Sequence, residues 1–505
     1  MSCSKIFSGD LPELTYKIIK YFQNDYSTLH SCILINRLWC RLTIPLLWEN
    51  PFSIPTNNYN FIETYFKTKL NESKIINDSL LPSASNTLFN YPKFLKYLYT
   101  YKFTFCIAKW LETSKPEIGL YSVTGLNDMC ISLFKIFIEN EVNLHTLEIE
   151  VSSTYYNTCL DKILELILQN KNFIHNIKNL KLFIGDYDEF KLIKNRITEI
   201  INLQQNLKKI LIGYDDLPSY QSLLLLKEYN CSNTLNTITF YHVNFNDIFN
   251  FYKIFEQLNV LESVNILYCS FLNTDFIQQI INLTKPFKLK SLFINELFQI
   301  ESLHLLLQKS GDSLENFGFD FNRNTIPRKI LLELFIKYCK NIKFLDLFEF
   351  EIQITYKIFD LIESIKKNLN YLSIHIWEDN RHLSIGNSII LQNLGQILPN
   401  KLEYINLSLV IKENDFKVFL ENSQDIFINK LLIFRQGGSD DILPYIKKYI
   451  MKEKRVRYLA IENIKKRREL SDLKDIVKEF KLHNIRIQSY RDLSINFDDF
   501  TMNID

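Results

Sequence analysis

The side chains best suited to catalysis or metal binding are scattered along the 505-residue sequence. No Cys and His residues have the spacing of a zinc site, and no C-x-x-C is present. The histidines are His30, His145, His175, His242, His304, His375, His382 and His483, and the cysteines are at positions 3, 32, 40, 106, 130, 159, 231, 269 and 339. An odd number of dispersed cysteines suits a reducing compartment, where Cys serves as a small core residue. We therefore expect no metal centre.

Motifs of the common enzyme classes are also missing. The sequence lacks G-x-G-x-x-G, Gly-Lys-Ser/Thr, H-E-x-x-H and G-x-S-x-G. It contains only 11 glycines, and glycine is the usual residue where backbone approaches a phosphate or an oxyanion. Acidic pairs such as Glu148 and Glu150 are expected on solvated strand faces. We expect a protein that is not an enzyme and needs no cofactor.

Composition and charge exclude several partner classes. Apolar residues make up 47% of the chain, and 59 basic against 57 acidic residues leave a net charge of +2. Such a chain has no global field that favours nucleic acid or an anionic membrane. No signal-peptide h-region is found, and the longest uncharged stretch, 383–400, is expected to form a buried amphipathic helix. These features predict a protein of the cytoplasm and/or the nucleus.

One local excess of charge occurs near the C-terminal end of the sequence. Lys and Arg gather between positions 447 and 468, interspersed with Glu453 and Glu462. This mixture favours a solvated helical face. A nuclear signal or a patch for an acidic partner is the alternative.

An internal repeat organises the last 360 residues. The pattern apolar-x-x-apolar-x-apolar occurs thirteen times, with first positions 25 to 33 residues apart and about 28 on average. The hexamers begin at Leu144, Ile177, Leu207, Leu235, Leu261, Leu289, Leu314, Ile342, Leu369, Leu402, Ile428, Val456 and Leu482. A single hexamer means little in an Ile/Leu-rich chain, but chance matches would not keep a constant interval.

Each repeat is predicted to be a short strand followed by a helix. Segments 219–229, 276–281, 330–339 and 356–366 have helical apolar spacing, whereas 344–350 and 371–377 alternate as strands do. The strands argue against the alternative, an armadillo-like helical array. The unit resembles the leucine-rich repeat of the ribonuclease-inhibitor-like or F-box-associated kind. The resemblance implies an α/β solenoid over 141–505, about 13 repeats long, with parallel strands on the concave face and helices outside.

A target-binding surface follows from the alternation of strand side chains. If the first, fourth and sixth hexamer positions are buried, the third, fifth and seventh face the concave side. In the middle repeats these positions are rich in aromatic residues, which are common at binding hot spots. The predicted target-binding residues are Asp320, Phe344, Asp346, Phe348, Tyr371, His375, Trp377 and Tyr404. The alternative is a chance cluster covered by helices or loops, since Phe and Tyr are frequent throughout.

The first fifty residues carry a second pattern. Leu11-Pro12-Glu13 opens a helix, with Pro12 where its missing N–H costs nothing, and a second apolar helix is expected over 29–39. Arg37-Leu38-Trp39 and Leu47-Trp48 follow. Residues 8–52 thus resemble an F-box of the large fungal type. Segment 53–140 is predicted to contain helices over 62–70, 91–111 and 126–141 and to pack the F-box onto the first repeat.

The F-box resemblance implies a partner. A helical module of about 45 residues is too small to bury all of its apolar side chains, and the surplus marks a partner surface. The implied partner is the Skp-type adaptor of a cullin–RING ubiquitin ligase. The predicted adaptor-binding residues are Leu11, Pro12, Ile18, Leu29, Cys32, Ile35, Trp39, Leu47 and Trp48. Some of these must be core, but Leu11, Pro12, Ile35, Trp39 and Trp48 are expected to be exposed.

Together the two resemblances imply a substrate-recognition subunit of an SCF-type ligase. The F-box would dock on the adaptor, and the repeats would hold a target protein whose identity the sequence does not reveal. The alternative is a leucine-rich-repeat scaffold or inhibitor in which the F-box-like segment only caps the solenoid, because end repeats need a cap.

Overall fold

The computed structural model describes fourteen stretches of the chain: residues 11–23, 25–54, 56–67, 87–114, 123–151, 159–185, 191–214, 231–246, 251–294, 299–321, 327–376, 383–436, 441–463 and 468–495. They fall into two units, one comprising Met1–Thr239 with Gln257–Leu261 and the other Phe240–Glu256 with Glu262–Asp505. No helix among these stretches is long and apolar enough to span a bilayer.

The first unit begins with three short helices, α2 (Pro12–Lys20), α3 (Tyr26–Ile33) and α4 (Arg37–Leu47). Pro12 occupies the first turn of α2 as expected. The Asp25 carboxylate caps α3 by accepting from the Thr28 N–H at 3.0 Å, and the Asn36 side chain caps α4 by accepting from the Trp39 N–H at 2.9 Å. The single helix predicted over 29–39 is therefore wrong, because α3 ends at Ile33 and Asn36 caps the start of a second helix.

The three helices share one small core. Ile19, Leu29, Cys32, Trp39 and Leu46 are buried against one another, and Phe22, Leu42 and Leu47 pack around them. The core thus takes up several residues that the sequence assigned to a partner surface.

The middle of the first unit contains more strand than predicted. After the 3-10 helix η1 (Pro51–Ser53) come α5 (Phe61–Lys67), the 3-10 helix η2 (Tyr91–Phe94), β1 (Tyr97–Tyr99), α6 (Thr100–Ser114) and α7 (Val123–Glu139). The helix predicted over 91–111 is wrong in its first half. Tyr97-Leu98-Tyr99 pairs in parallel with Thr146–Glu148 of the next strand, because only the central Leu98 is buried and the tyrosines flank it.

The first unit continues as alternating strands and helices. These are β2 (Thr146–Val151), α8 (Leu160–Gln169), the 3-10 helix η5 (Lys171–Ile174), β3 (Asn179–Ile184), α9 (Lys191–Asn202) and β4 (Lys209–Gly213), and β1 to β4 pair in parallel in chain order. β5 (Thr237–Tyr241) spans the boundary to the second unit.

The second unit repeats the strand–helix alternation. Its elements are α11 (Tyr252–Gln257), β6 (Ser263–Leu267), α12 (Thr274–Ile281), β7 (Leu289–Ile294), α13 (Ile300–Ser310), η7 (Gly311–Ser313), β8 (Asn316–Asp320), α14 (Arg328–Tyr338), β9 (Phe344–Phe348), η8 (Ile352–Ile354), α15 (Thr355–Ile365), β10 (Tyr371–His375), α16 (Leu383–Ile397), β11 (Lys401–Leu409), α17 (Glu413–Asn422), β12 (Phe427–Arg435), α18 (Leu443–Ile446), η9 (Lys447–Met451), β13 (Val456–Asn463), β14 (Arg468–Glu469), η10 (Leu470–Asp472), α19 (Lys474–Leu482), β15 (Arg486–Ile487) and α20 (Tyr490–Leu493).

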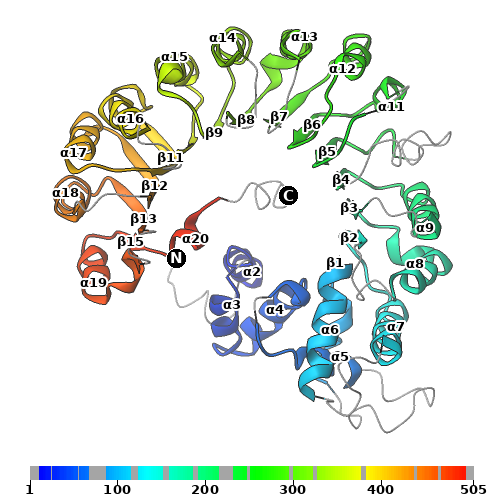
Figure 1. Cartoon of the computed structure of the whole chain (residues 1–505). Coiled ribbons are helices and arrows are strands. Elements are labelled where there is room, and N and C mark those ends of the chain that lie inside the picture. The colour runs from blue at the N-terminus through cyan, green and yellow to red at the C-terminus, as the bar shows by residue number, and fades with distance from the viewer. Residues whose placement is uncertain are drawn as a thin grey trace. The chain divides into compact units, whose positions relative to one another are not determined.

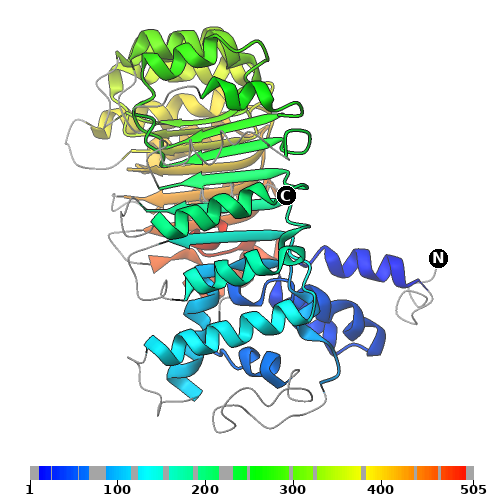
Figure 2. The same ribbon diagram turned by 90° about the vertical axis from the view of Figure 1, so that its right-hand side faces the viewer.

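The strands of this unit form a parallel sheet. β6 to β13 pair in chain order, β15 extends the sheet from β13 in parallel, and the short β14 is antiparallel. Within this unit the helices from α11 to α19 lie on one side of the strands, and the short α20 lies on the other, inner face of the sheet (Figure 1). Figure 2 shows neighbouring strands side by side and pointing the same way. The predicted α/β class with a parallel sheet is confirmed.

The repeat pattern marks the buried positions of this sheet. In β9 and β10 the fourth and sixth hexamer residues, Leu345, Leu347, Leu372 and Ile374, are fully buried. The strands predicted around 344–350 and 371–377 are confirmed as β9 and β10, and the helices predicted at 276–281, 330–339, 356–366 and 383–400 as α12, α14, α15 and α16. Among the first hexamer positions, Leu261 is half-buried and Leu482, which ends α19, is exposed. Segment 219–229 lies outside the described residues.

The basic run is not the solvated helix that the sequence predicts. Its described part is the π-helical η9, a turn, β13 and the first residue of β14. Arg455 is buried and donates to the carbonyls of Leu420 at 3.2 Å, Ile426 at 3.4 Å and Ser423. These carbonyls belong to the end of α17 and the loop after it, whose acceptors a buried guanidinium satisfies.

Candidate functional site

Three rows of side chains cross the inner face of β9, β10 and β11. The register places Phe344 beside Tyr371 and Tyr404, and Asp346 beside Ser373 and Asn406. A third row contains Phe348, His375 and Ser408. Because alternate residues of a strand share a face, all three rows point to the same side, away from the helices. The side chains of Asp346, Ser373 and Asn406 thus form a polar strip between two rows that contain more aromatic side chains.

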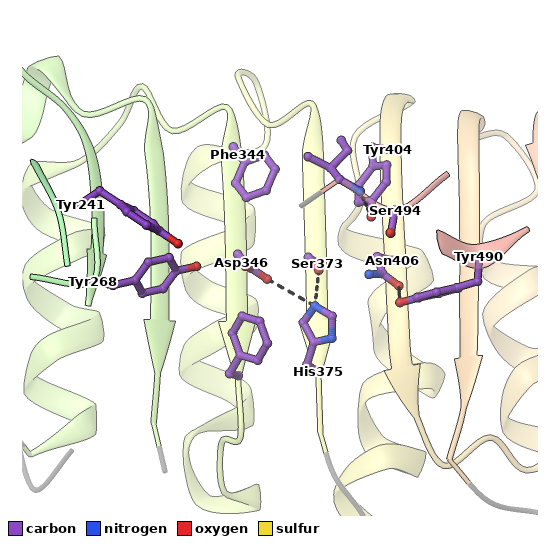
Figure 3. A pocket seen from close by; sticks show the side chains of 12 residues that line it. Tyr241, Tyr268, Phe344, Asp346, Ser373, His375, Tyr404, Asn406, Tyr490 and Ser494 are labelled. Carbon is purple, nitrogen blue, oxygen red and sulfur yellow. Dashed lines mark hydrogen bonds and ion pairs between the residues drawn. The ribbon is translucent and has the colours of Figure 1, made fainter. Parts of the chain in front are cut away.

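This strip is the floor of a pocket of ≈ 340 Å³. Its walls come from β5, the turn after β6, the two flanking rows and the chain that follows β15 (Figure 3). The lining residues are Tyr241, Tyr268, Phe344, Asp346, Phe348, Ser373, His375, Tyr404, Asn406, Tyr490, Ser494 and Ile495. Every one of them belongs to the second unit.

One wall is made by residues 489–495, here called the C-terminal segment. The Tyr490 hydroxyl donates to Asn406 Oδ1 at 2.8 Å, and the Ile495 N–H donates to the Tyr404 hydroxyl oxygen at 3.2 Å. Leu493 is buried in a cluster with Tyr404, Leu432 and Ala460. Leu432 of β12 and Ala460 of β13 continue the row that contains Asp346, Ser373 and Asn406. The C-terminal segment covers this apolar part of the face.

The opposite edge of the pocket depends on a glycine. Gly318 of β8 is the register partner of Asp346, and a Cβ at Gly318 would lie only 2.2 Å from Cδ1 of Phe293. Glycine therefore lets the Phe293 ring lie over β8. That ring contacts Tyr268 and Phe344, with centroids 5.7 and 6.0 Å away, and continues the aromatic wall.

Two of the predicted target-binding residues are not the solvent-facing rings that the sequence predicts. Tyr404 is only 1% exposed because Leu493 and Ile495 cover it, and Phe344 is buried between Phe293 and Tyr371. Phe348, Tyr371 and His375 are half-buried. Asp320 is half-buried on β8 but does not line the pocket, and Trp377 lies outside the described residues.

The acid on the floor has an unusual environment. Asp346 is 7% exposed, and burial raises its pKa to about 7 against an opposing hydrogen bond from Ser373. Its Oδ1 has no hydrogen-bond partner among the described residues and lies 3.5 Å from His375 Nε2. Burial lowers the pKa of His375 to about 4. Near neutral pH the imidazole is therefore uncharged.

Ser373, His375 and Asp346 do not form a catalytic triad. Ser373 Oγ lies 2.6 Å from His375 Nε2, and Asp346 Oδ1 approaches the same nitrogen (Figure 3). A triad needs the acid on the other ring nitrogen, so that the base can take the serine proton while the acid holds its tautomer. The imidazole is instead stacked on Phe348, with ring centroids 4.3 Å apart and planes 7° apart. The arrangement suits binding rather than acyl transfer.

Replacing Asp346 with Asn is expected to stabilise the protein increasingly as the pH rises from 4 to 7. The folded state keeps a proton on Asp346 up to about pH 7, whereas an unfolded chain releases it near 3.8, so wild type loses stability across that window. At 1.36 kcal/mol per pKa unit, a rise from 3.8 to about 7 makes the difference about 4 kcal/mol by pH 7. Thermal unfolding of both proteins at pH 4, 5, 6, 7 and 8 measures it.

The control for that experiment is a His375→Phe variant. Its stability relative to wild type should increase as the pH falls, which is the opposite dependence. Burial lowers the pKa of His375 from 6.5 to about 4, so wild type loses stability as the pH falls through that range. A pH-independent difference for Asp346→Asn would contradict the assignment of Asp346 as a buried, largely protonated acid. The other titratable groups facing it are Tyr404 and Tyr490, whose pKa values burial raises above the range tested.

The pocket includes residues that the sequence analysis did not single out. Asn406 could have been found, because it occupies the fifth hexamer position next to Ser373. Tyr241 could also have been found, because it occupies the seventh position of the hexamer that begins at Leu235. Tyr268 lies one residue beyond the seventh position of its hexamer and gave no distinct signal. Tyr490 and Ser494 lie beyond the last hexamer, where no periodic pattern announces a return to the sheet face.

The predicted adaptor-binding residues divide into two groups. Leu29, Cys32 and Trp39 are buried in the three-helix core, and Leu47 is half-buried against it. Trp48 is half-buried against Tyr91, Tyr65 and Phe61, with centroids 4.3, 5.0 and 6.4 Å away. The expectation that Trp39 and Trp48 are exposed is wrong. Trp39 packs in the three-helix core, and Trp48 packs against aromatic rings of the same unit. Leu11 is half-buried, and Pro12, Ile18 and Ile35 are exposed.

The exposed apolar residues of α2 to α4 extend beyond the predicted set. Leu14, Tyr16, Tyr21 and Leu34 are also exposed, Tyr21 at 85% and Leu34 at 77%. Leu14, Ile18 and Tyr21 are spaced as one stripe of α2, whereas Thr15, Ile19 and Phe22 form the stripe that faces the core. α2 therefore carries apolar residues on two faces, and only one of them is used inside this unit.

Within the described ranges, no group of three His, Cys, Asp or Glu side chains could hold a metal ion. The fold and the pocket define an α/β protein whose parallel sheet carries a polar, aromatic-walled cavity on its inner face. No family model matches the chain, and no curated protein matches its sequence.

Proposed function

We propose that this chain is a substrate-recognition subunit of an SCF-type cullin–RING ubiquitin ligase. In this proposal α2 to α4 are an F-box that docks on a Skp-type adaptor, and the strand–helix units are leucine-rich repeats that hold a target protein. The ligase would then modify the target because binding raises the effective concentration of its lysines near the charged conjugating enzyme.

The observation that carries the proposal is the unused apolar surface of the first three helices. Of the eighteen large apolar residues that are exposed among the described ranges, six lie in α2 or at the α3–α4 junction: Leu14, Tyr16, Ile18, Tyr21, Leu34 and Ile35. Single exposed apolar residues are ordinary, but so many on one small module indicate a partner. They adjoin the Leu11-Pro12-Glu13 and Arg37-Leu38-Trp39 segments on which the F-box resemblance rests.

The inner face of the parallel sheet supports the target-binding half of the proposal. It presents ring-lined concave positions on β9 to β11, and aromatic residues are enriched at binding hot spots. Of the predicted target-binding residues on these strands, Phe348, Tyr371 and His375 are only half-buried. Residue 404 is removed from that surface by the C-terminal segment, so the target would contact the part of the face on the β9 side.

A Leu34→Glu/Ile35→Glu double variant is expected to lose the adaptor. Both side chains are exposed at the α3–α4 junction, so the variant should fold with a stability change of about 0.5 kcal/mol or less per site. Two buried charges at an apolar interface should reduce recovery of a recombinant Skp-type adaptor by roughly tenfold or more. Co-purification of the full chain with that adaptor measures the effect, and Leu11→Ala/Pro12→Ala tests the start of α2.

The matched control is Leu88→Glu, which places the same charge at another fully exposed leucine of the first unit, at 92% exposure. It should leave adaptor recovery unchanged. Undiminished recovery with Leu34→Glu/Ile35→Glu would remove the docking assignment. Failure of the wild-type chain to bind any Skp-type adaptor would instead favour the scaffold or inhibitor, in which α2 to α4 only cap the solenoid.

A further inference from the structure

The pocket on β9 to β11 contains a carboxyl group that nothing within the protein fully uses. Asp346 is nine-tenths buried and faces the cavity, yet its Oδ1 accepts no hydrogen bond from a described residue. Buried polar atoms without a partner are uncommon in native proteins and usually indicate a water, an ion or a ligand. The cavity of ≈ 340 Å³ in front of it leaves room for such a ligand.

The surroundings of Asp346 select a positive charge. No Lys or Arg occurs among the described residues that line the pocket, and His375 stays uncharged near neutral pH. The rings of Tyr268 and Phe344 line the walls beside the acid (Figure 3). Phe348, two residues after Asp346 on β9, also lines the pocket. An electron-rich ring face and a buried carboxylate both attract a cation.

The geometry also favours one kind of cation. A metal ion would need several oxygen or nitrogen ligands, and among the described residues no group of three His, Cys, Asp or Glu side chains could hold one. A guanidinium is best held by two free carboxylate oxygens, whereas a hydrogen bond from Ser373 already engages this carboxyl. A single carboxylate oxygen that accepts no hydrogen bond suits the point charge of an ammonium group, and the aromatic walls suit an aliphatic stem.

We propose that this pocket binds a protonated primary alkylamine, with its ammonium group on Asp346 and its stem between the aromatic walls. The amine could come from a free diamine or from a lysine side chain of a bound protein, since both present the same group. The inference does not depend on adaptor docking, so either proposal can fail while the other stands.

The test is calorimetric titration of the full chain with n-butylammonium at pH 8, with neutral n-butanol as the matched probe. Wild type should bind n-butylammonium, and Asp346→Asn should bind it roughly tenfold more weakly or worse, because the neutral amide cannot pair with the charge. Asp320→Asn is the control, since it removes an acid from the same face one strand away and outside the pocket. It should bind as wild type does.

Two further arms complete the experiment. With the pKa of Asp346 at about 7, binding at pH 6 should be roughly tenfold weaker than at pH 8. The groups that face the acid, His375, Tyr404 and Tyr490, keep their charge over this interval. A terminally blocked lysine that binds as well as 1,5-diaminopentane would identify a protein side chain as the source, and a strong preference for the diamine would identify a free amine.

The proposal is overturned by any of three results. These are binding of n-butanol as tight as that of n-butylammonium, wild-type binding by Asp346→Asn, and an equal loss of binding in Asp320→Asn. Asp346→Asn preserves the shape of the side chain and removes an unpaired buried acid, so the variant is expected to fold. Its melting temperature, measured beforehand, separates lost binding from lost structure.

Discussion

A Tyr404→Ala variant should unfold far more easily than wild type and release the C-terminal segment. The ring is 1% exposed and packs with Leu432, Ala460 and Leu493, and its hydroxyl accepts the Ile495 N–H. Removing a buried aromatic ring costs about 3–5 kcal/mol. The loss of the hydrogen bond acceptor adds to this, because Ile495 then has no partner for its N–H at the rim of the pocket.

Thermal unfolding measures the stability of this variant, and amide hydrogen exchange over 489–495 measures the release of the segment. The control is Tyr356→Ala, which removes the same side chain from an exposed position on α15 and should change the stability by about 0.5 kcal/mol or less. If Tyr404→Ala proves as harmless as Tyr356→Ala and leaves exchange at 489–495 unchanged, the segment does not lie on the sheet as described.

The second large effect is expected at Trp39, where Ala should unfold the first three helices. Trp39 is buried among Ile19, Leu29 and Cys32 in a core of few residues. Truncation of a buried Trp costs about 3–5 kcal/mol, which is comparable with what so small a core supplies. Hydrogen exchange should show that α2 to α4 lose protection while β6 to β13 keep theirs.

Trp39→Ala and Leu34→Glu/Ile35→Glu should both lose adaptor binding, but for different reasons. Leu34→Glu/Ile35→Glu is expected to lose the adaptor with the helices intact, whereas Trp39→Ala should lose it because the helices unfold. Leu34→Ala serves as the control, since its side chain is 77% exposed and its loss should cost about 0.5 kcal/mol or less. Wild-type protection of α2 to α4 in Trp39→Ala would show that this ring is not core.

The repeat pattern predicted which face each strand residue takes, but not what lies on that face. Hexamer spacing follows from the burial of every second strand residue, so it placed Asp346, Ser373 and His375 together on the inner side. Periodicity carries no information on a segment that returns from outside the repeat. Tyr490 reaches Asn406 from 84 residues away, and Leu493 and Ile495 of the same segment bury Tyr404.

The first unit shows a similar limit. The apolar spacing of 11–48 predicted helices, yet both the core and a partner surface require apolar residues at helical intervals. Only the packing separates Ile19, which faces the core, from Ile18, which does not. The strand β1 escaped prediction because three residues, Tyr97-Leu98-Tyr99, are too few to break the helical pattern around them.

Hydrogen exchange of the full chain with and without a Skp-type adaptor tests whether α2 to α4 dock on that adaptor. We expect slower exchange in 12–21 and 34–37, where the exposed apolar residues lie, and unchanged exchange in β9 to β11. Absence of any protection at a saturating adaptor concentration, or protection confined to the parallel sheet, would contradict docking through α2 to α4.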